Sequence, residues 1–171
     1  MSKRIFPTAL IVVALGNLTA PAAHAASGNT STATGTVTAA VVAPIILTHT
    51  TGAALNFGKF TVSTGGTVVV TAASVGSVTG AVSFVPGGTT VAADKFSVTG
   101  DNSRNFTIAT TGGTITNGTK TITFGTTPSA ATATTSPTGT YAFTVGGALT
   151  ITGTETPGTY SGSYGATVTY D

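Results

Sequence analysis

Few residues in this chain have side chains able to carry acid–base or metal chemistry. The 171 residues include no Cys, two His and four acidic side chains. Without Cys there is no disulfide framework, Cys-ligated metal or thiol nucleophile. His24 falls in a segment that we expect to be removed, and His49 then lacks a second imidazole for a metal centre or a partner set for a triad. The composition argues against an enzyme.

The remaining polar groupings fit turns and strand pairs better than active sites. Asp94 and Glu155 could form a glycosidase pair, but no Trp is present to hold a sugar. Asp94, Asp101 and Asn102 supply too few oxygens for calcium, and Asp101-Asn102 reads as a turn. Four tyrosines could form a sugar-stacking patch or cross-strand pairs, and we favour the pairs: Tyr141, Tyr160, Tyr164 and Tyr170. We predict no catalytic residue, metal or cofactor.

The N-terminal residues have the pattern of a secretory signal. Lys3 and Arg4 precede an apolar run that ends at Leu18, and Ala23-His24-Ala25 fits a signal peptidase site. The run is shorter than the ~20 residues of a membrane-spanning helix. We therefore predict a signal peptide at 1–25, an N-terminal extension at 26–42 and a folded domain at 43–171. The exported protein would reach the periplasm, the cell surface or an extracellular fimbria, with no transmembrane segment left after cleavage.

Cleavage would leave a chain without net charge. Residues 26–171 balance four basic against four acidic side chains: Lys59, Lys95, Arg104 and Lys120 against Asp94, Asp101, Glu155 and Asp171. No basic patch remains for nucleic acid. The loss of charge repulsion also makes association between copies easier.

Period-two alternation of apolar and polar residues recurs along the chain and predicts an all-β fold. Turn signals separate the short segments, and Asn117-Gly118 is the sharpest, since a type I′ hairpin turn needs positive φ at both positions. The expected strands include 36–42 and 160–170, whereas the Thr-rich stretch 126–140 is expected to be a long mobile loop. This pattern predicts a two-sheet antiparallel β-sandwich. Its core would hold seven phenylalanines: Phe57, Phe60, Phe84, Phe96, Phe106, Phe124 and Phe143.

Both ends of the exported chain look like strands that could pair with another molecule. The extension has alternate small and apolar residues on one face: Ala33, Gly35, Val37, Ala39 and Val41. The C-terminal segment alternates up to the last residue and carries no Lys or Pro of the kind that commonly blunts an edge strand. Its predicted assembly residues are Gly158, Tyr160, Ala166, Val168 and Tyr170. Such strands can add to an open sheet edge.

These ends resemble those of chaperone–usher pilins. Such subunits carry a Gly fourteen places from the C-terminus and a penultimate Tyr, which correspond to Gly158 and Tyr170. The resemblance implies an incomplete, immunoglobulin-like β-sandwich whose groove is filled first by a chaperone strand and later by a neighbouring subunit's extension. Its partners would be further copies of itself, a periplasmic chaperone and an usher. Many pilins have a disulfide, which this chain lacks.

A second resemblance covers more of the chain. Val42-Ala43-Pro44-Ile45-Ile46-Leu47-Thr48, Leu55-Asn56-Phe57-Gly58 and the ending Val168-Thr169-Tyr170 are similar to the exported bacterial family known as domain of unknown function 4402. This resemblance implies a β-sandwich exported from a Gram-negative bacterium.

Two functions follow as expectations. The first is an exported, pilin-like structural protein of the cell surface, a fimbrial or adhesive component that assembles by β-strand addition. The alternative is a monomeric extracellular module that binds carbohydrate or another surface ligand. The alternative requires the N-terminal strand to pair within its own domain.

Overall fold

The computed structural model describes residues 28, 30–88 and 90–171. The chain divides into two units, Met1–Ala39 and Ala40–Asp171. The described residues of the first unit are exposed and form no strand. The strand expected at 36–42 is therefore wrong for this structure, since the first strand begins at Ile46. The predicted signal peptide, 1–25, lies outside the described residues.

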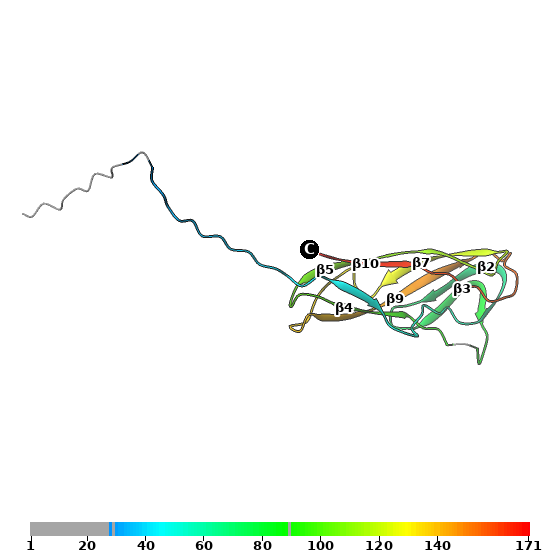
Figure 1. Ribbon diagram of the computed structural model, residues 1–171. Coiled ribbons are helices and arrows are strands. Elements are labelled where there is room, and N and C mark those ends of the chain that lie inside the picture. Colours follow the sequence, from blue (N-terminus) through cyan, green and yellow to red (C-terminus); the bar gives the residue numbers. More distant parts are fainter. Residues whose placement is uncertain (1–27, 29, 89) are drawn as a thin grey trace, which may run out of the picture. The chain divides into compact units, whose positions relative to one another are not determined.

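The second unit is an antiparallel β-sandwich of a seven-stranded and a three-stranded sheet (Figure 1). The large sheet consists of β1 (Ile46–His49), β2 (Phe60–Val70), β3 (Gly76–Phe84), β4 (Asp94–Thr99), β6 (Gly113–Thr116), β7 (Thr121–Pro128) and β9 (Thr140–Ile151). The small sheet has the order β10 (Gly165–Tyr170), β5 (Asn105–Thr111), β8 (Thr132–Thr134). All these pairings are antiparallel, as the sequence predicted.

Strand β9 is the centre of the large sheet. It pairs with β7 along one edge, and along the other with β4 in its first half and β2 in its second half. The change of partner falls at Gly146 and Gly147, where a Cβ would collide with the carbonyl oxygens of Val70 and Gly125. Only glycine lets the neighbouring backbones approach so closely.

The alternating residues of the strands fill two neighbouring core clusters. One gathers buried side chains of β2, β3, β7 and β9, and the other joins β4 and β9 to β5 of the small sheet. All seven predicted core phenylalanines belong to or pack against these clusters, which confirms that prediction. Burial of one such side chain contributes about 1.5–3 kcal/mol, so the seven together contribute much of the apolar stabilisation of the domain.

The segment 126–140 is ordered into strands, contrary to the mobile loop expected from its composition. Strand β7 continues to Pro128, β8 follows, and Thr135 is 3% exposed. The Thr135 hydroxyl donates to the carbonyl of Asp101 and accepts from the backbone N–H of Arg104. These backbone partners, distant in sequence, order a stretch whose own residues show little apolar pattern.

The hairpin predicted at Asn117-Gly118 is present between β6 and β7, but its turn differs from the prediction. Pairing ends at Thr116 and Thr121, so the loop has four residues instead of two. Gly118 has a φ of 96°, whereas Asn117 is not among the residues with positive φ. The Asn117 side chain accepts hydrogen bonds from the backbone of Thr119 and Lys120, an Asx turn that substitutes for type I′.

Candidate functional site

The C-terminal strand β10 has one paired and one unpaired edge. Its six residues pair with β5, from Gly165 opposite Thr111 to Tyr170 opposite Phe106. In residues 30–88 and 90–171, no backbone hydrogen bond reaches the other edge of β10. Ala166, Val168 and Tyr170 are half-buried on one face of the strand. The outer edge therefore presents N–H and C=O groups that an added strand could pair.

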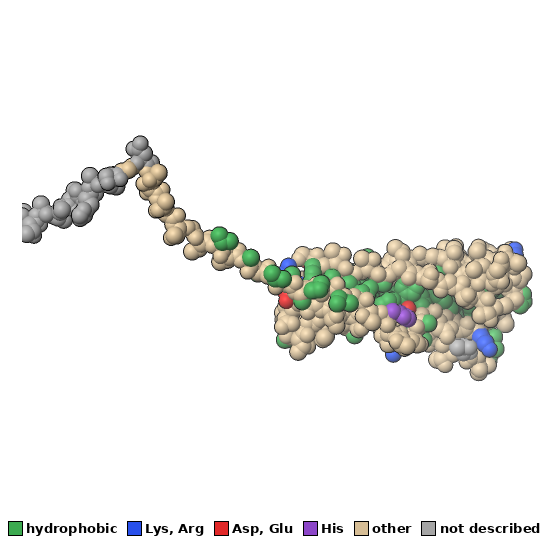
Figure 2. Space-filling model, viewed as in Figure 1, with side chains coloured by type: hydrophobic (Ala, Val, Ile, Leu, Met, Phe, Trp, Pro, Cys, Tyr) green, Lys and Arg blue, Asp and Glu red, His purple; other side chains and the backbone are tan. Residues whose placement is uncertain are grey.

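Strand β1 brings a second unpaired edge close to β10. It pairs only with β4 among the described strands, and it lies near β10 in space. We call the boundary between these two edges the β1–β10 seam. Half-buried apolar side chains on and beside β1, β4 and β10 pack against the second core cluster: Ile45, Leu47, Phe96, Tyr164, Val168 and Tyr170. Hydrophobic side chains form a band along the domain on the face shown in Figure 2. The side chains at the rim of this core cluster are therefore partly exposed, while its central residues are buried.

A polar cluster of His49, Asp94 and Tyr164 lies beside this apolar lining. Asp94 is 4% exposed. Its Oδ1 accepts hydrogen bonds from His49 Nε2 at 2.7 Å and from the Lys95 backbone N–H at 2.8 Å. Its Oδ2 accepts from the Tyr164 hydroxyl at 2.9 Å. An ionised carboxylate only accepts hydrogen bonds, so the proton of the neutral imidazole is assigned to Nε2. The cluster ties β1 and β4 to the segment that leads into β10.

Tyr164 also connects the two core clusters, against which its half-buried ring packs. The ring lies 6.2 Å from that of Phe96 and 6.3 Å from that of Phe124. Burial, followed by the hydrogen bond and the negative charge of Asp94, raises the pKa of the Tyr164 hydroxyl far above its usual value of 10. The hydroxyl is therefore a hydrogen-bond donor at neutral pH.

Sequence reasoning missed this cluster. It treated His49 as a lone residue without partners and weighed Asp94 only with Glu155 or as a calcium ligand. The signal that was overlooked is the alternation of inward and outward side chains along a strand. Asp94 shares the inward face of β4 with Phe96 and Val98. A carboxylate at such a position needs partners from neighbouring elements.

Among the described residues, Asp94 and Glu155 share no hydrogen-bond partner. Glu155 is half-buried, and its carboxylate accepts hydrogen bonds from Thr152 and Gly153. Burial works to raise the pKa of Glu155, but these hydrogen bonds outweigh it and lower the pKa below its usual value. The role of Glu155 is local, in the turn after β9.

The predicted donor residues lie in exposed chain with no strand structure. Ala33, Gly35 and Ala39 are exposed, and Val37 and Val41 are 95% and 98% exposed. In the described chain, their backbones make no strand pairing. Exposed apolar side chains on unpaired backbone are the chemical requirement for strand addition, although their pairing with a partner stays a prediction.

The predicted C-terminal assembly residues separate into two groups. Ala166, Val168 and Tyr170 share one face of β10. Gly158 and Tyr160 precede that strand, and Tyr160 packs on the first core cluster. The strand expected to run unbroken over 160–170 is therefore shorter than predicted. Ser161 bridges to Thr116 of β6 in the large sheet, so the segment changes sheets before β10 begins.

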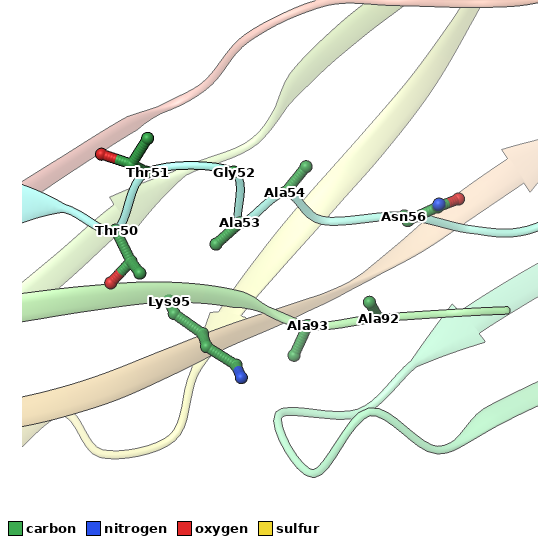
Figure 3. A pocket seen from close by; sticks show the side chains of 9 residues that line it. All are labelled: Thr50, Thr51, Gly52, Ala53, Ala54, Asn56, Ala92, Ala93 and Lys95. Atoms are coloured by element: carbon green, nitrogen blue, oxygen red, sulfur yellow. The ribbon is translucent and has the colours of Figure 1, made fainter.

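A pocket of about 400 Å³ opens beside Lys95 (Figure 3). Small side chains line it: Thr50, Thr51, Gly52, Ala53, Ala54, Asn56, Ala92 and Ala93. Lys95 is the one charged residue of this lining. Within the described residues, no three His, Asp or Glu side chains are grouped to hold a metal ion. That part of the chain also contains no helix long and apolar enough to span a membrane.

Comparisons with known proteins place the chain in a family. Residues 47–170 match the family described as Domain of unknown function (DUF4402). This match covers more than half of the chain and runs from β1 to the end of β10. Comparisons with curated proteins and with solved structures gave no match. The resemblance to this family is thereby confirmed, and the chain belongs to the DUF4402 family.

Proposed function

We propose that this protein is an exported, pilin-like structural subunit of the cell surface that assembles by β-strand addition. The observation that carries the proposal is the unpaired outer edge of β10 near the unpaired edge of β1, with half-buried apolar side chains on and beside both strands. An edge of this kind is a template for another strand.

The occupant that we assign to the seam is the N-terminal extension of a second copy. Ala33, Gly35, Val37, Ala39 and Val41 would face the core, while the threonines between them would face solvent. The extension is uncharged over 26–42, so its insertion buries no unpaired charge. This mechanism requires no bond to be made or broken.

Two kinds of interaction would stabilise the added strand. Apolar burial contributes roughly 25 cal/mol per Å² removed from water, chiefly from the two valines. Each backbone hydrogen bond to a sheet edge adds about 0.5–1.5 kcal/mol net. Several such bonds along β10, with Val37 and Val41 buried, would hold one copy to the next.

Export and the partners belong to the same proposal. A signal peptide at 1–25 would deliver the chain to the periplasm, where a chaperone strand would cover the seam until an usher brings a second copy. The final location would be the cell surface or a fimbria, where such a polymer could support adhesion.

Deletion of residues 26–42 tests the proposal. Light scattering after size-exclusion chromatography should show polymers of the protein that begins at Ala26 and none of the deletion variant. The deletion variant, supplied with a peptide of residues 26–42, should remain folded and bind that peptide. A protein that stays monomeric and binds no peptide would instead support the alternative, a monomeric surface module that binds a carbohydrate or another ligand.

A further inference from the structure

The junction between the extension and β1 is anchored at Ala43. The carbonyl oxygen of Ala43 accepts a hydrogen bond from the Tyr170 hydroxyl at 3.1 Å. The same hydroxyl accepts from the backbone N–H of Asp101 at 2.6 Å, and the Arg104 guanidinium lies 5.6 Å from the Tyr170 ring centre. A Cβ at Gly100 would collide with this hydroxyl, so the turn after β4 is shaped to receive it. Ala43 is thus fixed to the last strand and to that turn.

The residues that follow the anchor are held as well. Ile45 is half-buried against the second core cluster, and β1 pairs with β4 from Ile46 onward. To enter the seam of its own domain as a hairpin with β1, the extension would have to reverse direction within about 42–45.

A two-residue hairpin loop at Ala43-Pro44 would turn the apolar face of the extension away from the core. It would pair Val41 with Ile46 and Ala39 with Thr48, and paired residues point to the same side of a sheet. Ile46 and Thr48 are exposed, whereas Leu47 faces the core. The apolar face of the extension would therefore point to solvent and its threonines to the core. Such a loop also favours positive φ, which Pro44 cannot adopt.

A three-residue loop would turn the apolar face of the extension toward the core, but two of its residues disfavour the backbone conformation that it needs. With a loop of 43–45, Val41 pairs with Leu47 on the core side. The usual loop of this length has a type I turn followed by a residue with positive φ, which would be Ile45. A β-branched residue rarely adopts that conformation, and Pro is disfavoured at the second position of the turn. In the described chain, Ser74 and Ser103 are the only non-glycine residues with positive φ.

We propose that the Ala43–Pro44–Ile45 junction, held by Tyr170, prevents the extension from filling the seam of its own domain and commits it to a second copy. This inference rests on the proposed function and adds the structural feature that keeps the extension out of its own domain. Tyr170 acts here as a positioning residue.

A flexible insertion tests this inference without altering any residue of the junction or the core. Five Gly and Ser residues inserted between Val42 and Ala43 let the chain reverse freely. In the matched control, the same insertion stands between Thr32 and Ala33, so the donor segment stays attached to the intact junction. Both variants keep the full chain from Ala26.

Hydrogen exchange of the dilute, monomeric proteins measures whether the extension pairs with its own domain. Amides 33–41 should exchange freely in the parent and the control, and roughly tenfold or more slowly in the junction variant. The junction variant should also lose polymers and the binding of a labelled peptide of residues 26–42. Slow exchange in the monomeric parent, or unchanged exchange in the junction variant, would overturn the inference.

Peptide binding separates failure of this inference from failure of the proposed function. If the parent binds the labelled peptide while the junction variant behaves like the control, the inference alone is overturned. If neither the parent nor the control binds the peptide or forms polymers, the proposed function fails, and this inference fails with it.

Discussion

The Tyr170 hydroxyl donates a hydrogen bond to the carbonyl oxygen of Ala43, a residue 127 positions earlier in the chain. This contact links the end of β10 to the residues just before β1, the two strands whose unpaired edges form the seam. The first and last parts of the domain are therefore coupled through one side chain.

Replacement of Tyr170 by Phe should weaken the domain. The change leaves the Asp101 N–H and the Ala43 carbonyl without their partner, and we expect a loss of about 1–3 kcal/mol in the free energy of unfolding. Urea unfolding measures it. Tyr160→Phe is the control, because within the described part of the chain the Tyr160 hydroxyl bonds only the nearby Thr156 carbonyl. Equal losses in the two variants would contradict a special role for Tyr170.

Replacement of Tyr164 by Phe should destabilise the domain and change its response to alkali. The variant leaves the buried carboxylate of Asp94 with one donor fewer, which costs about 1–3 kcal/mol at neutral pH. Because the folded-state pKa of Tyr164 is raised, its stabilising effect is complete below pH 10 and declines as the pH rises through that raised value. The free energy of unfolding should therefore fall more steeply above pH 10 in the parent than in Tyr164→Phe.

Tyr141→Phe provides the control for this experiment. Its hydroxyl makes no hydrogen bond within the described residues, although its ring packs on Phe106 at 5.6 Å. Because Tyr141→Phe retains Tyr164, its free energy of unfolding should fall more steeply above pH 10 than that of Tyr164→Phe. A parent and a Tyr164→Phe variant with identical slopes would show that Tyr164 does not titrate as the structure indicates.

A charge on the donor face of the extension should block assembly. Val37→Asp replaces an apolar side chain that we expect to be buried in a partner, whereas Thr36→Asp adds the same charge to the opposite face. Loss of a buried Val costs about 1.5–3 kcal/mol, which corresponds to roughly a tenfold to hundredfold weaker interaction. Fluorescence anisotropy of labelled peptides 26–42 measures the affinities. Similar weakening by both substitutions would remove the support for a defined inward face.

Gly147, where β9 changes its pairing partner from β4 to β2, should tolerate no side chain. Gly147→Ala places a Cβ against the carbonyl of Gly125, and we expect a loss of about 1–3 kcal/mol in the free energy of unfolding. Gly125→Ala is the matched control, since its Cβ would meet no atom within 4 Å. Thermal unfolding of the two variants compares them directly. A Gly147→Ala domain as stable as the control would contradict the close approach at this position.

Alternation along the chain was enough to predict the fold class and the core phenylalanines, because strand parity fixes which side chains face inward. It failed where distant backbone determines structure. Thr135 shows this, as its partners in the Asp101–Arg104 turn order a segment that by itself reads as a loop. The same parity rule, applied to Asp94, would have indicated a buried carboxylate with partners.

The candidate site was predictable only in part. The alternation of Ala166, Val168 and Tyr170 correctly identified one face of β10, but the same pattern gave no sign that the chain changes sheets at Ser161. Alternation in the extension predicted a strand that the structure does not contain, because a strand requires a partner as well as a pattern.

Hydrogen exchange of β10 in the presence of a peptide of residues 26–42 tests the central claim most directly. Alternate amides of β10 already bond β5, and the others face the unpaired edge. If an added strand occupies the seam, those edge amides should become protected when peptide is added and remain unprotected with the Val37→Asp peptide. Binding of the peptide with no change in the exchange of β10, or no binding at all, would contradict assembly by strand addition at this edge.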